Sequence, residues 1–476
     1  MYEKDLGNGL LLRWVKPQDV EKIAKGMVDV FSPPDKRFEA IGGWFLRYAY
    51  GMGGFMKSSD AVVIIDTKKE GEPVVGFTCY WQETQVYEGI PFIAGKHNQL
   101  IFYTSVIPTA RPEFVGVLPD PEYRGQRLQQ HIMDALHARA NDENHLVQVI
   151  NGINWYYRQF GYEYALEFGE RSKVWLSAVP ALKEGEQEFI KYRRATLDDI
   201  DTIQEIDLAQ VDSSAVYIPL SKEWLASQIN DHHQKSENPE HVVLRDVLML
   251  EDAQDNIVGY VVVSNLNAAM TETESLGVYN MGLKRGIDTK TALFSTMRQL
   301  IQFAKSTYEQ ERVSNVKSLA WYMSQWHPVA EAIPPTMRNL AQLRHEALAY
   351  YVRVPDLTKF LQHILPALNR RLEQSLTHNN YTGVVRISQY TPRYPGVELK
   401  FEKGVIVEVT QYIKKDQARD PSVAFFPPHT FLQVLFGKRS IEELMSFLPD
   451  VFMELDVKEV LDVIFPKKKS VLAHLM

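Results

Sequence analysis

Cysteine is almost absent from this sequence, since Cys79 is the only one among 476 residues. A single cysteine excludes an internal disulfide and a CxxC metal site. The 13 histidines also lack the HExxH spacing of a helical zinc site. Cys79 lies in the apolar run FTCYW, where a small buried side chain is expected. The sequence therefore predicts a protein that binds no metal and belongs to a reducing compartment.

Long apolar runs and an excess of basic residues are also missing. No window approaches the ~18 apolar residues of a membrane span, and the N-terminal MYEKDLGNGL lacks the features of a signal peptide. The 60 acidic residues outnumber the 52 basic ones, so no broad basic face indicates nucleic-acid binding. The 45% apolar and 24% charged residues are typical of a soluble globular protein. We expect a cytoplasmic protein of roughly three domains.

The most informative feature that is present is a weak internal repeat. Residues 13–19, RWVKPQD, recur as RRATLDD at 193–199, and in both copies a strand is expected to end near the arginine and a helix to begin near the aspartate. The segment VVGF at 74–77 matches IVGY at 257–260. Two further matches pair EFVGV at 113–117 with ESLGV at 274–278, and NWYYRQF at 154–160 with AWYMSQW at 320–326.

Four matches in the same order predict two homologous α/β domains, residues 1–185 and 186–360. Residues 361–476 follow another pattern. Apolar positions between 397 and 401 alternate with charged ones, and the turn at 402–404 leads into a second alternating strand, which predicts an antiparallel hairpin. A helix ending at Gly437 and a helix opened by a capping box at Ser440 are expected to follow. The third domain is thus predicted to be a small sheet covered by helices.

A basic turn joins a strand to a helix in the first copy. The segment PEYRGQRLQQHIM (121–133) follows an apolar stretch, and apolar residues at helical spacing predict a helix from Leu128 onward. Backbone N–H groups in such a turn and at a helix N-terminus favour an anion. Gly125 is the turn's one glycine, while Arg127 and Gln129 stand where others are expected. We expect a working phosphate site rather than a vestigial turn, because losing a glycine removes no N–H donor.

The order of strand, basic turn, helix, strand and aromatic segment resembles the GNAT superfamily of acyl-CoA-dependent N-acetyltransferases. PEYRGQRLQ corresponds to the family's R/Q-x-x-G-x-G/A motif, and YYRQFGY (156–162) to its later FYxxxGF motif. The tandem copies and the third domain are similar to the enhanced-intracellular-survival (Eis) branch. This resemblance implies an α+β protein with two tandem GNAT-like mixed α/β domains, the second degenerate, followed by a domain like the sterol carrier protein fold.

The resemblance also implies acetyl-CoA as co-substrate and no metal. The family binds the cofactor's pyrophosphate on main-chain N–H groups of the turn and its pantetheine arm along the end of the preceding strand. Pro119 departs from this pattern because proline has no N–H, so weaker acyl-CoA binding is expected. The cofactor-binding residues implied are Val117, Leu118, Pro119, Arg124, Gly125, Gln126, Arg127, Leu128 and Gln129.

By the same resemblance, Tyr157 is the general acid that protonates the departing thiolate, with core packing as the alternative role of this tyrosine. The branch implies the terminal carboxylate, here that of Met476, as the base; a water relay through Glu88 or His97 is the alternative. In the second copy Met323 matches Tyr157, and methionine cannot donate a proton. The second domain is therefore expected to be a scaffold.

The implied acceptor is a primary amine on a small cationic molecule, such as a polyamine or an aminoglycoside, or on a lysine. The net negative charge favours a basic acceptor, and association within the branch favours a homo-oligomer. The alternative is a non-catalytic protein of this fold that binds a lipid or other hydrophobic ligand through its C-terminal domain. The residues expected to receive a cationic amine are Trp44, Tyr80, Trp81, Glu83, Tyr87 and Glu88.

Overall fold

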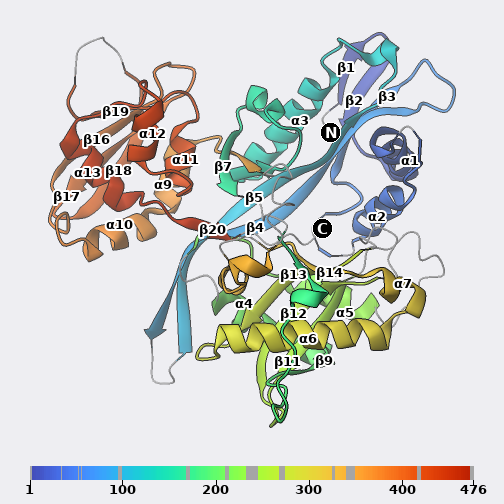
Figure 1. The fold of residues 1–476 in the computed structure, drawn as a ribbon. Coiled ribbons are helices and arrows are strands. Elements are labelled where there is room, and N and C mark those ends of the chain that lie inside the picture. The colour runs from blue at the N-terminus through green and yellow to red at the C-terminus, as the bar shows by residue number, and fades with distance from the viewer. Residues whose placement is uncertain are drawn as a thin grey trace.

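Three β-sheets with flanking helices form the protein, seen here in a computed structural model (Figure 1). The mixed α/β architecture agrees with the predicted fold class. The structure describes residues 3–33, 35–51, 53–54, 56–94, 99–167, 172–209, 214–231, 245–266, 274–323, 327–338, 349–414 and 420–471, and of residues 84, 86, 88–94, 99–105, 167, 231, 349 and 471 it describes the backbone alone.

A ten-stranded sheet lies at the centre of the molecule (Figure 1). Its strand β3 (Ala61–Asp66) is buried on both faces. Val62 and Ile64 pack toward one core, and the alternate residues Val63 and Ile65 toward another, as expected of a central strand covered by helices on both sides. The other strands are β1 (Glu3–Gly7), β2 (Leu10–Trp14), β4 (Val74–Ala94), β5 (Gln99–Val117), β6 (Val147–Ile150), β15 (Ala349–Arg353), β7 (Glu163–Glu167), β10 (Ser214–Tyr217) and β20 (Lys469–Val471). The helices are α1 (Val20–Phe31) and α2 (Ala40–Ala49) on one face and α3 (Leu128–Asp142) on the other.

The second sheet has six strands, and its two faces carry separate cores. The strands are β8 (Ser172–Trp175), β14 (Ser318–Trp321), β13 (Ser275–Leu283), β12 (Ile257–Ser264), β11 (Arg245–Glu251) and β9 (Lys191–Arg194). The helices nearby are α4 (Ile200–Leu208), α5 (Lys222–Asp231), α6 (Thr289–Thr307), α7 (Gln310–Asn315) and α8 (Pro328–Glu331).

The third sheet has four strands and lies to one side of the first (Figure 1). The predicted hairpin and the capping box at Ser440 are both confirmed, the latter with Ser440 Oγ accepting from Glu443 N at 3.1 Å. The strands are β18 (Val405–Tyr412), β17 (Gly396–Glu402), β16 (Gly383–Ser388) and β19 (Val423–Phe425). The helices are α9 (Leu357–His363), α10 (Leu365–Gln374), α11 (Phe431–Leu435), α12 (Ile441–Phe447) and α13 (Leu455–Ile464).

Strands are exchanged between the sheets. β8, which follows the first sheet's strands in sequence, pairs with β14 of the second sheet, whereas β15, which follows the second sheet's strands, pairs with β6 and β7 of the first. A linear division at residues 185 and 360 therefore does not coincide with the sheets, and the three predicted domain ranges stay predictions. Among the described residues, no helix has the length and apolarity needed to cross a bilayer. Cys79 is buried, as predicted.

The first repeat match is confirmed in atomic detail. Arg13 donates to Asp19 at 2.6 Å, and Arg193 donates to Asp199 at 2.7 Å. Each aspartate also accepts from the backbone N–H three residues earlier, at 2.7 and 2.8 Å, and each directly precedes a helix, α1 or α4. The two copies therefore share one ion-paired strand-to-helix corner.

The third and fourth matches were misaligned. Gly116 pairs with Phe77 in the first sheet, and Gly282 pairs with Tyr260 in the second, so Gly116 corresponds to Gly282 and not to Gly277. A Cβ on Gly116 would lie 2.7 Å from the Phe77 ring, and one on Gly282 would lie 2.5 Å from the Tyr260 ring. Both glycines therefore make room for an aromatic ring on the neighbouring strand.

The same correction affects Met323. Trp321 ends β14, whereas Trp155 lies beyond the end of β6 and directly precedes the 3₁₀ helix Tyr156–Phe160. Met323 therefore does not occupy the position of Tyr157. Glycine and tryptophan recur at several positions in these segments, so matches of a few residues were not enough to align the two copies correctly.

Candidate active site

The basic turn is held in place by Tyr123. A 3₁₀ turn, Pro121–Tyr123, follows β5, and the Tyr123 hydroxyl donates to Asp66 at 3.1 Å. The Lys69 ammonium lies 4.9 Å from the centre of the Tyr123 ring. Burial and the neighbouring Asp66 raise the pKa of Tyr123 to about 12. Tyr123 thus remains a protonated anchor that joins the turn to β3.

The N-terminus of α3 is left open toward the turn. Arg127 occupies its N-cap position with φ 53° and ψ 32°, and within the described part of the chain no side-chain cap accepts a hydrogen bond from the helix's first N–H groups. In the second copy, the Asp288 carboxylate accepts from Thr291 N at 2.7 Å and caps α6. An anion therefore already occupies the second helix N-terminus, whereas the first one retains donors for a ligand.

A cleft of about 700 Å³ opens beside this turn and brings together most of the predicted cofactor-binding residues. Pro119 and Gln126 do not line it, and the Gln126 side chain instead donates to the Glu122 carbonyl at 2.7 Å. The cleft is lined by Val117, Leu118, Tyr123, Arg124, Gly125, Arg127, Leu128, Gln129, Gln130, Tyr156, Gln159 and Phe160.

The end of β5 presents unpaired backbone groups beside the cleft. β5 pairs in parallel with β6 at Thr109 and Ala110, and the two strands do not pair beyond these positions within the described residues. Leu118 N donates to the Val75 carbonyl of the opposite neighbour, β4, at 2.9 Å. Because donors alternate along a strand, the N–H of Val117 points to the open edge.

A bulge redirects the same strand. The pairing of β5 with β4 shifts between Glu113 and Gly116, and Phe114 has φ 52°, in the left-handed region. Val115 lies within this bulge, where the alternation of donors is interrupted. Alternation therefore fixes the Val117 N–H alone at the gap between β5 and β6.

Two adjacent tyrosines follow β6 in the 3₁₀ helix Tyr156–Phe160 and differ in their surroundings. Tyr156 lines the cleft, and its hydroxyl donates to Gln129. The Tyr157 side chain is 5% exposed, and its hydroxyl has no hydrogen-bond partner among the described residues. Burial, and next the charge of Glu113, raise the pKa of Tyr157. Tyr157 therefore keeps its proton and has no internal acceptor for it.

A buried charged cluster lies on the strands beside Tyr157. Arg111 forms ion pairs with Glu113 and, at 3.7 Å, with Glu83. Its guanidinium also lies 5.8 Å from the ring of Trp81. Burial raises the pKa of Glu113, and Arg111 opposes that effect. Two carboxylates thus share one guanidinium in the interior of the first sheet.

The predicted amine-binding residues are only partly brought together. Trp44 packs against Trp81 with ring centres 5.9 Å apart, and Glu83 joins them through Arg111. Tyr80 lies on the other face of β4, where its hydroxyl donates to Glu143 at 2.9 Å. Tyr87 donates to the Leu435 carbonyl at 2.8 Å and contacts the third sheet's core instead. The Glu88 side chain, His97 and Met476 lie outside the described residues.

Several residues beside the cleft were not predicted from the sequence. Gln130 and Gln159 line it, and Val115 lies in the bulge of β5. The one signal in the sequence for Val115 was its place two residues before Val117 on an expected strand. Glu113 appeared only as part of a repeat match, because its closeness to Tyr157 depends on how two separate strands pack.

Arg127→Gly should stabilise the protein, because a left-handed conformation costs an L-residue about 1–2 kcal/mol and glycine almost nothing. We expect the free energy of unfolding to rise by up to about 1 kcal/mol, with less than about tenfold loss of acetyl-CoA affinity, because the backbone donors remain. Urea unfolding and calorimetry measure the two effects. The control is Gln130→Gly, which is helical and should destabilise; equal losses in both variants would contradict the argument.

No family model matches the sequence, and no curated protein matches it. Solved structures do match its fold. A GCN5-related N-acetyltransferase from Anabaena variabilis is 12% identical, with a TM-score of 0.62, over 97% of this chain and 98% of that one. One from Kribbella flavida is 15% identical, with a TM-score of 0.60, over 98% of both chains. Eis1 from Mycobacterium abscessus is 12% identical, with a TM-score of 0.52, over 96% of this chain and 98% of that one. The chain therefore has the fold of GCN5-related N-acetyltransferases along nearly its whole length.

Proposed function

We propose that this protein is an N-acetyltransferase that moves an acetyl group from acetyl-CoA to a primary amine. The observation that carries the proposal is the meeting of two sets of free main-chain donors at one cleft: the open N-terminus of α3 and the unpaired edge of β5. The names of the structurally similar proteins, GCN5-related N-acetyltransferases, support the same reaction class.

The two sets of donors fit two parts of the donor molecule. The amides from Gly125 to Gln129 would bind the pyrophosphate, because hydrogen bonds to charged groups contribute about 1.5–3 kcal/mol each. Arg124 and Arg127 add positive charge at the same end of the cleft. The Val117 N–H would bind the pantetheine arm. Pro119 offers no donor on this edge, which is why we expect modest acyl-CoA affinity.

We assign Tyr157 as the acid that protonates the departing sulfur. Its hydroxyl is protonated at neutral pH and has no partner among the described residues. Glu113 is the described carboxylate whose charge acts on Tyr157, so it is an additional candidate to take up the proton of the amine. The second copy would serve as a scaffold, because Asp288 already caps the helix that would receive a pyrophosphate.

The C-terminal strand supports the prediction that the Met476 carboxylate is the base. β20 follows α13, a helix of the third sheet, and pairs with β10, which in turn pairs with β4 beside Tyr87. The last described strand thus returns the chain to the first sheet, whose strand β5 borders the cofactor cleft.

Adding a short tail after Met476 should lower kcat by about 100-fold or more if this carboxylate accepts the proton. The same tail placed before Met1 is the control. Steady-state assays of both proteins, with circular dichroism as a check on folding, measure the effect. Full activity of the C-terminally extended protein would show that the base is Glu113 or a water relay and not the Met476 carboxylate.

We further propose an Eis-like enzyme with a small cationic amine as acceptor and a third domain of the sterol-carrier-protein type. The acidic and aromatic cluster of Glu83, Glu113 and Trp81 supports a cationic acceptor. Similarity to Eis1 along nearly the whole chain supports the branch. A homo-oligomer in the cytoplasm stays our expectation.

Thiol release from acetyl-CoA tests the proposed function directly. We expect the purified protein to release CoA only when an amine is added, from a panel of polyamines, aminoglycosides and lysine peptides. Release with any amine rejects the non-catalytic alternative. Absence of both release and acetyl-CoA binding by calorimetry, together with a co-purifying lipid in mass spectrometry, would favour that alternative.

A further inference from the structure

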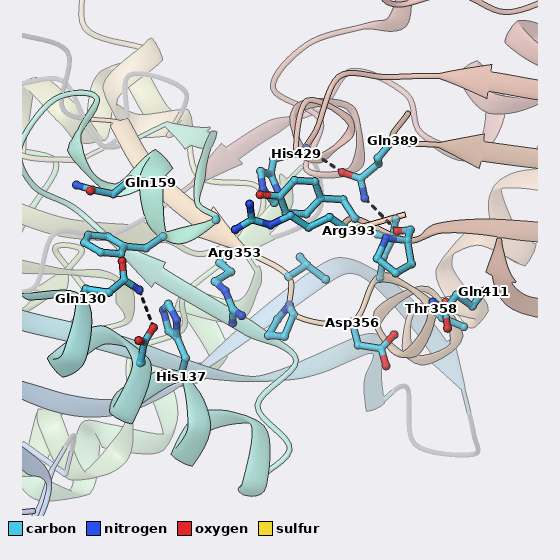
Figure 2. A pocket seen from close by; sticks show the side chains of 18 residues that line it. Gln130, His137, Gln159, Arg353, Asp356, Thr358, Gln389, Arg393, Gln411 and His429 are labelled. Atoms are coloured by element: carbon cyan, nitrogen blue, oxygen red, sulfur yellow. Dashed lines mark hydrogen bonds between the residues drawn. The ribbon is translucent and has the colours of Figure 1, made fainter. Parts of the chain in front are cut away.

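A second cavity, of about 490 Å³, lies where the first sheet meets the third. One wall is formed by α3, by the end of the 3₁₀ helix after β6, and by β15; the other is formed by loops of the third sheet (Figure 2). We call it the interface pocket. It shares Gln130, Gln159 and Phe160 with the cofactor cleft, so the two cavities are neighbours across these side chains.

Two guanidinium groups enter the interface pocket from opposite walls. Figure 2 shows Arg353, from β15, and Arg393, from a loop of the third sheet, both extending into it. Arg353 is half-buried, and this burial lowers its pKa. Among the described residues its guanidinium donates to the neutral Gln148 side chain at 2.8 Å. No carboxylate of the described residues forms an ion pair with Arg353 or Arg393. A desolvated charge that faces a cavity without a counter-ion is costly unless a ligand supplies one.

The carboxylates of the pocket are engaged elsewhere. Asp134 accepts from Gln130 at 2.7 Å, and Asp356 accepts from the backbone N–H of Lys359 at 3.0 Å, where it caps α9. Neither forms an ion pair with Arg353 or Arg393 among the described residues, although the charge of Asp134 acts on Arg353 from a longer distance and partly offsets the lowering of its pKa.

Two half-buried histidines complete the lining. His137 contacts the Tyr162 hydroxyl at 3.0 Å, and the His429 ring packs on Tyr394 with ring centres 4.5 Å apart. Burial, with Arg353 as the next cause in each case, lowers the pKa of His137 to about 3 and that of His429 to about 4. Both rings are thus neutral at pH 7 and add N–H donors without further charge.

We propose that the interface pocket binds a phosphate monoester, held by Arg353 and Arg393 from its two walls. A phosphate dianion matches two guanidinium charges, and its oxygens accept paired hydrogen bonds from each guanidinium. The site is separate from the pyrophosphate turn. Because its ligand touches both the first and the third sheet, occupancy links the third sheet to the wall that carries the segment Tyr156–Phe160.

Two sources supply this chemistry. One is the 3′-phosphate of CoA, which would pass Gln130 and Gln159 from the cofactor cleft; this source rests on the proposed function. The other is a separate phosphorylated metabolite or free phosphate, and this source is independent of the proposed function. The shared residues between the two cavities favour the first source.

The test compares CoA, 3′-dephospho-CoA and inorganic phosphate by calorimetry on the full chain. The variants are Arg353→Gln, Arg353→Lys and Arg393→Gln; Arg393 is exposed, so its variant folds even if Arg353→Gln does not. The control is Arg285→Gln, which removes an exposed arginine from the turn of the second copy.

If CoA supplies the phosphate, CoA binds at least about tenfold more tightly than its dephospho form, and both pocket variants remove this difference while the control keeps it. If a separate ligand supplies the phosphate, inorganic phosphate binds even when CoA is saturating, and the Arg353 and Arg393 variants abolish that binding. Arg353→Lys should retain part of either effect. The inference is overturned if CoA and 3′-dephospho-CoA bind equally well and inorganic phosphate does not bind. The proposed function is unaffected by that result as long as 3′-dephospho-CoA binds and the protein still transfers acetyl groups.

Discussion

Replacing Tyr157 with phenylalanine should lower kcat by about 100- to 10,000-fold, the usual contribution of a general acid. The affinity for acetyl-CoA should change by less than about twofold, because the Tyr157 hydroxyl makes no hydrogen bond with a described residue and does not line the cofactor cleft. The ring, which packs 5.5 Å from that of Tyr351, is retained, so the fold should be unaffected. Thiol release with a saturating amine measures kcat, and calorimetry measures the affinity.

The neighbouring Tyr156 provides a matched control. Tyr156→Phe also removes one hydroxyl, but this hydroxyl donates to Gln129 at the cofactor cleft. It should therefore weaken acetyl-CoA binding several-fold, roughly the value of one neutral hydrogen bond, and leave kcat nearly unchanged. If Tyr157→Phe keeps full kcat, or if the two variants exchange their effects, the acid has been assigned to the wrong tyrosine.

The sequence predicted those features that depend on neighbours along the chain. The pair Arg13 and Asp19 recurs as Arg193 and Asp199 because one strand-to-helix corner uses six consecutive positions to satisfy its own backbone. The capping box at Ser440 is equally local. The basic turn before α3 belongs to this class too, which is why its residues were found as a group.

Features that depend on sheet pairing were missed. Neither the exchange of β8 and β15 between sheets nor the correspondence of Gly116 with Gly282 leaves a local trace, since both arise from strands far apart in sequence. The left-handed conformation of Arg127 was not predicted either, because an arginine, unlike a glycine, gives no sign of positive φ. The structure shows that this position does adopt positive φ.

The candidate site likewise combines residues that a local motif predicted with residues that only sheet pairing brings together. Tyr157 was predicted from a local motif, but its relation to Glu113 depends on two strands that separate after Ala110. Arg353 drew no notice in the sequence, because its place beside Gly161 and His429 exists only where β15 returns to the first sheet and the third sheet packs against it. The interface pocket thus exists only because β15 joins the first sheet, and it shares side chains with the cofactor cleft.

The protein should lose stability between pH 6.5 and pH 4 because three histidines, of which His327 is buried and His137 and His429 are half-buried, are held in the neutral form. Burial lowers the pKa of His137 to about 3 and those of His327 and His429 to about 4. A depressed folded-state pKa means that the unfolded chain takes up protons as the pH falls through its ordinary value of about 6.5, while the folded protein does not. The stability is therefore complete above pH 6.5 and declines toward pH 4, by about 2 kcal/mol per histidine at pH 5.

Urea unfolding at pH 7.5 and at pH 5 measures this loss, and His137→Gln distinguishes its cause. The variant should be less stable at pH 7.5, because it loses packing and the contact with Tyr162, yet it should fall less on acidification, since one proton-binding difference is gone. The matched control is His363→Gln, which makes the same substitution at an exposed histidine. Carboxylates whose pKa is lowered by ion pairs, such as Asp199, lose their contribution to stability only below about pH 4, so their pH range is separate from that of the histidines.

A flat stability curve from pH 7.5 to pH 5 would show that the imidazoles reach water in the folded protein, and the interface pocket would then be wetter than its geometry indicates.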